Sequence, residues 1–244
     1  MIVEPRVTLI ASTCIEVSKN DMESDALSEW METYPEFTAA EMLTEFAGRA
    51  CYQSWTRPNP ATRNTGDYLR RTLFQQGHFS IAEHASATFY ITGVSRAFTH
   101  ELIRHRHLSF SQLSQRFVDE SDSNIVLPPA VRGAFEDSRE EDYDSPMVDA
   151  LMDADIAAQD AYTAIVHELG DAGLPRKQAR EAARAVLPNM METRIVVTGN
   201  MRAWHEFLGK RLDPAADAEM QEVAGMIRDE LHEVAPNIFP KADA

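Results

Sequence analysis

The stretch ASATFYIT, residues 85–92, alternates apolar and polar side chains along its length. Ala87, Phe89 and Ile91 would lie on one side of an extended chain, and the residues between them on the other. This period-two pattern predicts a β-strand with one buried face. Because such a face is buried only where other elements cover the sheet, residues 85–92 indicate a fold in which a sheet packs against helices.

Further strands and helices are predicted on both sides of this strand. Residues 7–17 and 193–198 are rich in β-branched side chains and predict strands, and residues 110–118 alternate as an extended segment does. The acidic residues 119–145 are predicted to form a loop. Helical periodicity marks the segments 38–52 (with Met42, Phe46 and Ala50 near one face), 67–76, 94–107, 146–169, 175–187, 200–212 and the stretch that starts at Asp213.

The whole chain is expected to fold as one unit. No internal repeat or low-complexity linker divides it, so residues 1–244 are predicted to form a single α+β domain, with helices packed around a modest, mainly antiparallel sheet. The chain lacks the GxGxxG loop of a dinucleotide-binding Rossmann fold, which is therefore not expected. Cys14 and Cys51 are too few for a disulfide framework and are expected to be small buried side chains.

Charge is distributed unevenly along the chain. The formal net charge is −16, which argues against broad nucleic-acid binding because that binding depends on lysine and arginine. Residues 119–160 hold thirteen acidic residues against Arg132 and Arg139. By contrast, residues 96–116 hold four arginines and one acid, and residues 176–211 hold eight basic residues and three acids. Two basic islands in an acidic chain predict a pocket for a small anion.

Residues 104–117, RHRHLSFSQLSQRF, form the densest polar cluster in the sequence. Three arginines, two histidines, three serines and two glutamines are mixed there with leucine and phenylalanine, which implies partial burial. Since burying an unpaired guanidinium group is costly, these arginines are expected to meet an anion. A salt-bridged surface helix would explain an isolated RHR tripeptide, but such a helix does not require the SFSQLSQR that follows.

This stretch closely resembles the signature of the flavin-dependent thymidylate synthases, in which RHR is followed by seven residues and a serine. Arg104, His105 and Arg106 supply the RHR, and Ser114 is the serine, with Arg116 two residues beyond it. The acidic loop resembles the family least. Other segments resemble family segments in the same order: GRACYQSW at 48–55, GHFSIAEHASATFYI at 77–91, SRAFTHELI at 95–103, ARAVLP at 183–188 and NMRAWHEFLGKR at 200–211.

The resemblance implies an enzyme that makes dTMP from dUMP by reductive methylation, a step of dTTP biosynthesis. In this family FAD takes a hydride from NADPH, 5,10-methylenetetrahydrofolate supplies the one-carbon unit, and reduced flavin completes the methyl group on uracil C5. Because reduced flavin is anionic near N1, residues 104–106 are expected to surround it with positive charge and hydrogen-bond donors. By family match, the residues in contact with FAD are Ser80, Arg104, His105, Arg106, Gln112, Asn200, Met201 and Arg202.

The resemblance also implies a dUMP site that overlaps the FAD site. Arginine forks and hydroxyl groups suit the nucleotide's phosphate, so residues 112–116 and Arg184 are expected to bind it. Arg211 is the predicted catalytic residue, because it matches an arginine thought to favour ionisation of uracil N3 and so make C5 a better nucleophile. The full set expected at dUMP is Glu101, Leu102, Ile103, Arg104, Gln112, Leu113, Ser114, Gln115, Arg116, Arg184 and Arg211.

Glu206 departs from the family, which often has histidine or asparagine at this place. A carboxylate beside anionic reduced flavin would oppose reduction unless it pairs with a cation. Arg202 and Lys210 lie four residues before and after Glu206, within reach on a helix. Glu206 thus stands at a family position for FAD, but its departure from the family residue argues against a direct contact between Glu206 and the flavin.

Other chemistries stay open for some of these residues. Ser114 could act as a covalent nucleophile with His105 or His107 as its base, although phosphate binding explains the serine without a relay. The histidines lack the spacing of a helical zinc site, so no metal is expected. A phosphate clamp for a nucleotide or RNA is the main alternative function, and a metal-dependent hydrolase is another.

The family is homotetrameric, with active sites built from several subunits at an interface. The resemblance therefore implies that basic islands far apart in the sequence converge in the tetramer. Small-molecule substrates, dUMP and folate, are the expected partners, with no nucleic acid and no membrane. The opening residues 1–12 do not have the pattern of a signal peptide, and no apolar run approaches the roughly 20 residues of a membrane-spanning helix, so a cytoplasmic location is expected.

Overall fold

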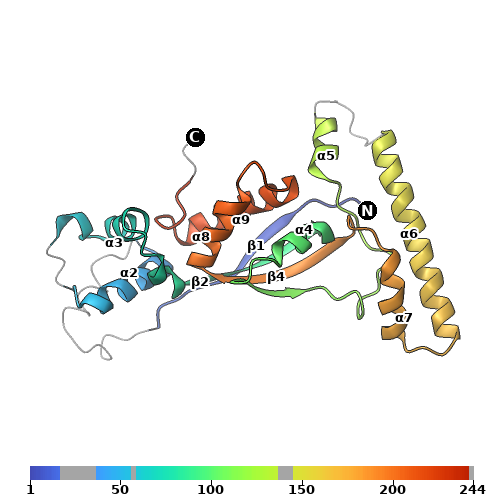
Figure 1. The fold of residues 1–244 in the computed structure, drawn as a ribbon, viewed down its shortest axis with the longest axis horizontal. Helices are drawn as coiled ribbons and strands as arrows, with labels where there is room; N and C mark the ends of the chain where they lie inside the picture. The colour runs from blue at the N-terminus through green and yellow to red at the C-terminus, as the bar shows by residue number, and fades with distance from the viewer. Residues whose placement is uncertain (17–36, 56–58, 137–144, 242–244) are drawn as a thin grey trace.

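The computed structural model describes residues 1–16, 37–55, 59–136 and 145–241 (Figure 1). Within these residues, four antiparallel strands form one sheet in the order β1-β2-β4-β3. The strands are β1 (Arg6–Ser12), β2 (Ser86–Ser95), β3 (Ser109–Gln112) and β4 (Glu192–Asn200). The predicted fold class, helices around a mainly antiparallel sheet without a Rossmann fold, is confirmed.

The central strand β2 buries the face that its alternation predicts. Ala87, Phe89 and Ile91 are almost fully buried, whereas Tyr90 between them is partly exposed. The strand is interrupted by a bulge at Gly93, whose φ is +66°; a Cβ there would lie 1.9 Å from the carbonyl oxygen of a residue before β1. Glycine at this position therefore lets the N-terminal segment pass close to the sheet.

Three helices cover the buried face of the sheet: α4 (Arg96–Leu102), α8 (Met201–Arg211) and α9 (Ala218–Val234) (Figure 1). Trp204 and Phe207 of α8 are fully buried, and Trp204 Nε1 donates a hydrogen bond of 3.1 Å to the carbonyl oxygen of Ala87. The Trp204 ring also meets the Phe89 ring edge to face, at 5.1 Å between centroids. These contacts fix α8, which carries several predicted site residues, onto β2.

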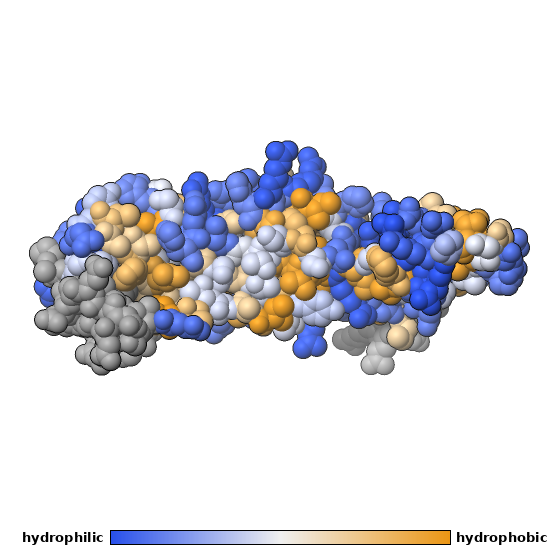
Figure 2. All heavy atoms as spheres, turned by 90° about the horizontal axis from the view of Figure 1, so that it is seen from below, coloured by the Kyte–Doolittle hydropathy of each residue, from blue (hydrophilic) through white to orange (hydrophobic). Residues whose placement is uncertain are grey.

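No helix of the described residues covers the opposite face of the sheet. Its side chains include Tyr90 and the Thr88 and Thr198 hydroxyls, which lie 2.9 Å apart, and Ile10 of β1 is 53% exposed. Figure 2 shows this side of the molecule, where apolar and pale residues are mixed with polar ones. The sheet thus has one face in the core and one face at the surface.

One end of the molecule is built around α2 (Ala39–Tyr52). Its inner face is polar, because Arg49 Nε lies 2.5 Å from the Glu45 carboxylate and both side chains are fully buried. Met42, Phe46 and Ala50, which we expected near one face of this helix, are each partly buried. Arg49 also donates to two loop carbonyl oxygens, and these bonds satisfy a buried cation. Beside α2 lie η2 (Pro60–Thr62), α3 (Thr65–Leu69), η3 (Arg70–Gln75) and η4 (Phe79–Glu83).

The other end carries α6 (Pro146–Asp171), whose N-terminus is capped by the Ser145 side chain, next to α7 (Arg176–Ala183) and η5 (Arg184–Val186) (Figure 1). A small separate core of Ile125, Leu127 and Val148 holds this end together. The predicted loop 119–145 contains a helix, α5 (Pro129–Glu136), so the loop prediction was wrong there. Residues 137–144 of that segment lie outside the described residues.

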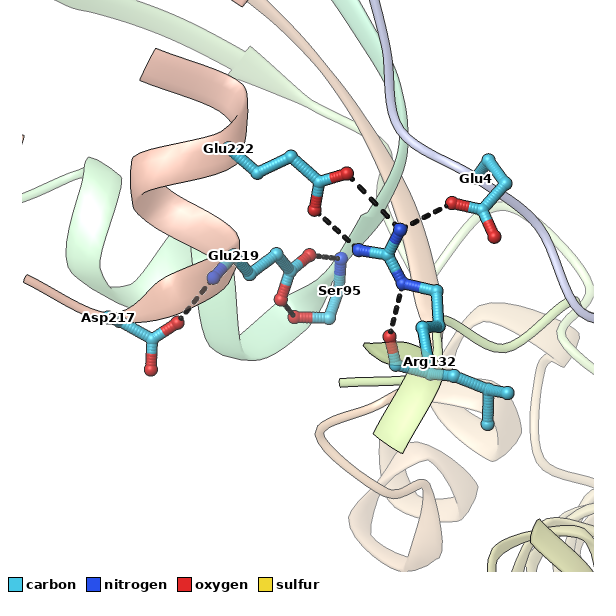
Figure 3. A network of polar contacts seen from close by, with 7 residues as sticks. Glu4, Ser95, Arg132, Asp217, Glu219 and Glu222 are labelled. Carbon is cyan, nitrogen blue, oxygen red and sulfur yellow. Dashed lines mark hydrogen bonds and ion pairs between the residues drawn. The ribbon is translucent and has the colours of Figure 1, made fainter. Parts of the chain in front are cut away.

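A polar network ties α5 and the N-terminal segment to α9 (Figure 3). The Arg132 guanidinium group pairs with the carboxylates of Glu4 and Glu222. Beside it, the buried Glu219 accepts hydrogen bonds from Ser95 N at 2.7 Å and from Ser95 Oγ at 2.6 Å. Burial raises the pKa of Glu219. Because Ser95 caps α4, Glu219 holds the start of the helix that leads into the candidate site.

Two further predictions need correction. Cys14 and Cys51 are both exposed and free, not buried, because neither faces the core. The last helix begins at Ala218, with Asp217 as its cap, because residues 213–216 form turns ahead of it. Among the described residues, no helix is both long enough and apolar enough to cross a membrane.

Candidate active site

The RHR motif lies in a tight turn between α4 and β3. The structure ends α4 at Leu102, so the predicted helix 94–107 was too long. Leu102 and Leu108 are both buried, and the backbone bonds from His105 N to Leu102 O (3.1 Å) and from Leu108 N to His105 O (3.0 Å) close the turn. Residues 109–112 must be extended to pair with β4, so the chain has to leave the helical conformation before Ser109. The motif therefore projects from the sheet between two apolar anchors.

Gly199 at the end of β4 makes room for this turn. A Cβ at Gly199 would lie 2.4 Å from Leu108 Cδ2 and 3.1 Å from Trp204 Nε1. Any side chain there would displace the Leu108 side chain and crowd the Trp204 ring. The glycine thus allows the RHR turn, β4 and α8 to meet.

Residues of the RHR turn and of α8 line a cavity of about 530 Å³ that is open to solvent. Four permanently charged cations line it, together with two carboxylates and two histidines. Since the whole chain carries a net charge of −16, this concentration of positive charge is a local feature. The lining residues are Glu101, Arg104, His105, Arg106, His107, Leu108, Ala203, Glu206, Lys210 and Arg211.

Arg211 is one of the lining residues, and two partners hold its side chain in place. Its Nε donates a hydrogen bond of 2.8 Å to His105 Nε2, and its NH1 group lies 3.2 Å from Glu101 Oε2. Arg211 is largely buried, with 18% of its side chain exposed, and the His105 ring packs against the Phe207 ring at 5.0 Å between centroids. The guanidinium group is therefore held in place by partners from α4 and from the RHR turn.

His105 is neutral in this arrangement. Burial and the neighbouring Arg211 and Lys210 lower its pKa from 6.5 to about 4, and Glu101 opposes the shift. Because Nε2 accepts the bond from Arg211, the ring proton resides on Nδ1. We expected His105 to supply positive charge to a cofactor, but at neutral pH it supplies one hydrogen-bond donor and no charge.

A second cavity of about 220 Å³ adjoins the first, and His107, Ala203 and Glu206 line both. Arg202 lies between two carboxylates here: its NH1 group is 2.5 Å from Glu83 Oε1 and its Nε is 3.2 Å from Glu206 Oε1. Of the two cations within reach of Glu206 on the helix, it is Arg202 that pairs with it.

Of the other residues expected at FAD, some are exposed near the second cavity and others are buried in the scaffold. Ser80 is exposed in η4, next to the second cavity's Glu83. Asn200 caps α8 through its Oδ1, which accepts from Ala203 N at 2.8 Å. Met201 is buried in the core, and Gln112 Nε2 donates to two threonine hydroxyls of the scaffold. Asn200 Nδ2 and Gln112 Oε1 are the side-chain groups that these bonds leave for a ligand.

The residues expected at the dUMP phosphate form a separate group near α7. Arg116 Nε lies 2.6 Å from Glu181 Oε2, and neither Ser114, Arg116 nor Arg184 lines the cavity around Arg211. Arg184 is exposed at the start of η5. Burial lowers the pKa of Arg96, and the positive charge of Arg184 adds to this shift while Glu120 opposes it. Arg184 follows Glu181, the partner of Arg116, by three residues, and this group stands apart from the residues that line the cavity around Arg211.

The remaining residues of the predicted dUMP set differ in how far their side chains are exposed to solvent. Ile103 is exposed at 47%, whereas Leu102 is fully buried, so a contact from Leu102 would come from its backbone. Gln115 is buried with its Nε2 unpaired, and Leu113 pairs with β4 through its backbone N–H. Leu113 and Gln115 therefore anchor the segment on either side of Ser114.

Sequence reasoning missed His107 and Lys210 as lining residues of the cavity. Both could have been suspected from the sequence, because His107 directly follows the RHR motif and Lys210 directly precedes Arg211. The nucleophile hypothesis gains no support, because no hydrogen bond joins Ser114 to His105 or His107, which all lie within residues 59–136. In the described part of the chain, no three side chains of histidine, cysteine, aspartate or glutamate are arranged to hold a metal ion.

Comparisons with known proteins agree with the sequence resemblance. The profile of the family described as "Thymidylate synthase complementing protein" matches residues 35–237. The flavin-dependent thymidylate synthase of Mycobacteroides abscessus is 52% identical over 208 residues, which cover 82% of this chain and 79% of that protein. That of Mycobacterium tuberculosis H37Ra is 51% identical over 204 residues, covering 81% of this chain and 77% of that protein.

A solved structure shows the same fold. The UMP/dUMP methylase PolB from Streptomyces cacaoi, bound with 5-Br dUMP, superposes with a TM-score of 0.68 at 20% identity, covering 98% of this chain and 94% of that one. At this identity the likeness concerns the fold. The family profile and the relatives of about 50% identity, which both span most of the sequence, show that the chain belongs to the flavin-dependent thymidylate synthases, a family of enzymes.

Proposed function

We propose that this chain makes dTMP from dUMP by reductive methylation, with FAD as bound cofactor, NADPH as reductant and 5,10-methylenetetrahydrofolate as one-carbon donor. The observation that carries the proposal is the cationic cavity around Arg211, in a chain whose net charge is −16. A cavity lined by four permanent cations suits a cofactor and a substrate that are both anionic. FAD, when bound, supplies the hydride that completes the methyl group.

The residues of the RHR turn would hold the flavin. Arg104 and Arg106 are exposed on the cavity wall and present guanidinium donors, and His105 offers its Nδ1–H. Such donors, fixed before the ligand arrives, stabilise negative charge that develops on a flavin during reduction. Gln112, Ser80 and the first turn of α8 complete the set proposed for FAD.

Arg211 would act on the pyrimidine ring of dUMP. Its hydrogen bond to His105 and its ion pair with Glu101 fix a permanent cation in a largely buried position. A cation beside uracil N3 favours loss of the N3 proton, and the resulting negative charge makes C5 a stronger nucleophile. Arg211 is therefore the proposed catalytic residue.

We also propose that the active site is completed by another subunit in a homotetramer. Ser114, Arg116 and Arg184, which suit the nucleotide's phosphate, do not line the cavity that contains Arg211. The cavity is open to solvent on one side, and one face of the sheet has no helical cover in the described residues. Assembly of identical chains through closed symmetry would bring a phosphate group from one chain to the cavity of another. Residues 1–244 would then act as one catalytic domain.

The proposal is tested by purification and anaerobic assay. The purified protein, or the protein after incubation with FAD, is expected to show flavin absorbance that NADPH bleaches without oxygen. Addition of dUMP and 5,10-methylenetetrahydrofolate is then expected to produce dTMP, and omission of either should abolish it. Protein that takes up no FAD, or that oxidises NADPH without ever forming dTMP, would overturn the proposed function.

A further inference from the structure

Glu83, Arg202 and Glu206 form a three-residue cluster where the two cavities meet. Arg202 and Glu206 lie one turn apart on α8, and Glu83 comes from η4, more than a hundred residues earlier in the sequence. Arg202 uses its NH1 group for Glu83, at 2.5 Å, and its Nε for Glu206, at 3.2 Å. Two carboxylates on one guanidinium group leave a net charge of −1 in the cavity wall.

Glu206 is the member of the cluster placed to affect both cavities. It lines the larger cavity with Arg104, Arg106 and Arg211, and it lines the smaller one with Arg202. Glu83 lines only the smaller cavity. Glu206 and Arg202 are both 42% exposed, so their pairing is open to solvent and to an incoming ligand. The Glu206 carboxylate is therefore a negative charge in a wall whose other charges are mostly positive.

The position of Glu206 has two electrostatic consequences for an anionic ligand. Its carboxylate repels the ligand directly, and this repulsion is larger at a partly desolvated cavity wall than in water. It also engages the Nε group of Arg202. A phosphate or flavin oxygen that approaches Arg202 therefore competes with a carboxylate already bound there. Both effects grow with the negative charge of the ligand.

We propose that Glu206 sets how strongly this cavity holds flavin: its charge and its hold on Arg202 weaken FAD binding and make the bound flavin harder to reduce. The inference rests on the proposed function, because it places FAD in this cavity. Reduced flavin carries more negative charge near N1 than oxidised flavin does, so Glu206 opposes the reduced form more strongly. Glu206 is thus a specificity-determining residue for the redox state of the cofactor.

The test compares FAD binding and flavin potential in wild type and in Glu206→Gln. Binding is measured by quenching of FAD fluorescence in the apoprotein, and the potential by reductive titration against a reference dye. We expect the Kd for FAD to fall about threefold to tenfold and the potential to rise, with each tenfold preference for reduced flavin equal to about 30 mV. The gain should diminish at high salt, because the effect is one of charge.

Matched controls separate the local effect from net charge and from folding. Glu206→Asp keeps the charge and is expected to show no tightening. Glu168→Gln removes the same unit of charge from an exposed position on α6 and should leave both quantities at their wild-type values. In an Arg202→Gln background, Glu206→Gln should tighten FAD binding less than it does in wild type, because there is no Arg202 guanidinium group for the substitution to release from Glu206. An undiminished gain there would overturn the role assigned to Arg202.

Each result separates the inference from the function it rests on. If wild-type protein binds FAD and Glu206→Gln binds it with the same affinity and potential, the inference is wrong and the proposed function stands. Weaker binding by Glu206→Gln would also overturn the inference, since the carboxylate would then be a favourable contact. If neither protein takes up FAD, the proposed function fails and the inference with it.

Discussion

Arg211 donates a hydrogen bond from Nε to Nε2 of His105, 106 residues earlier in the chain, at 2.8 Å. The bond joins the last turn of α8 to the RHR turn, so the two basic islands of the sequence meet through it. It also assigns the His105 proton to Nδ1 and keeps the ring uncharged, because a protonated ring could not accept it. The pair thus presents one permanent cation and one neutral donor to the same cavity.

Removing the Arg211 guanidinium group should affect methyl transfer more than flavin reduction. For Arg211→Ala, we expect dTMP formation to fall about 100-fold, as for loss of one fixed charge-stabilising group, with a much smaller change in NADPH oxidation. Both rates are measured on the same preparation by product analysis and by absorbance. Arg211→Lys keeps a cation and should retain more methyl transfer than the alanine variant. Equal loss of both activities in Arg211→Ala would contradict the proposed role.

The low pKa of His105 predicts a loss of stability in mild acid. The folded-state pKa is about 4 against an ordinary value of 6.5, so between these two pH values the unfolded chain binds a proton that the folded chain refuses. The free energy of unfolding should therefore decrease as pH falls from 6.5 to 4. Urea unfolding at several pH values measures it.

Substitution of His105 provides the control for this pH effect. His105→Asn cannot titrate in this range, so its stability should fall less steeply over the same window than that of wild type. His100→Asn, which changes an exposed histidine on α4, should follow the wild-type curve. Parallel curves for wild type and His105→Asn would show that His105 does not carry the effect.

Mixed subunits test whether the site is shared between chains. Arg211 lines the cavity, whereas Arg184 is not among its lining residues. If these residues serve one site from different chains, Arg211→Ala and Arg184→Ala are each expected to be nearly inactive alone. Co-expressed in equal amounts, they should recover about a quarter of wild-type activity, because that share of sites receives both arginines. No recovery in verified mixed oligomers would place both arginines in sites within one chain.

Glu219 should stabilise the start of α4. Glu219→Ala removes the acceptor of two hydrogen bonds from Ser95, one of which comes from a buried backbone N–H. A buried donor left unpaired costs about 1–3 kcal/mol, and for a chain of this size each kcal/mol lowers Tm by about 2–4 °C. Calorimetry measures the shift. The control Glu168→Ala, on the exposed face of α6, should leave Tm unchanged. If Glu219→Ala also has the Tm of wild type, Glu219 does not stabilise the start of α4.

Periodicity predicted where the main elements lie, because side-chain alternation follows directly from strand and helix geometry. The strand around Phe89 and the helix around Trp204 were placed correctly for this reason. The helix through the RHR motif was predicted too long, since its end is set by the pairing of β3 with β4, a contact remote in sequence. The buried Glu45–Arg49 pair of α2 could not be predicted from periodicity, because two charged residues take the place of the usual apolar contacts.

The sequence alone determined the family and the residue types of the site, because the RHR motif and its following serine are contiguous in the chain. Only the tertiary structure decided which of these residues meet and in which charge state. It joined Arg211 to His105, made that histidine neutral through burial beside two cations, and set Glu206 against Arg202. The physical reason is that pKa values and ion pairs depend on distances in space and on burial, and neither is written in the order of residues.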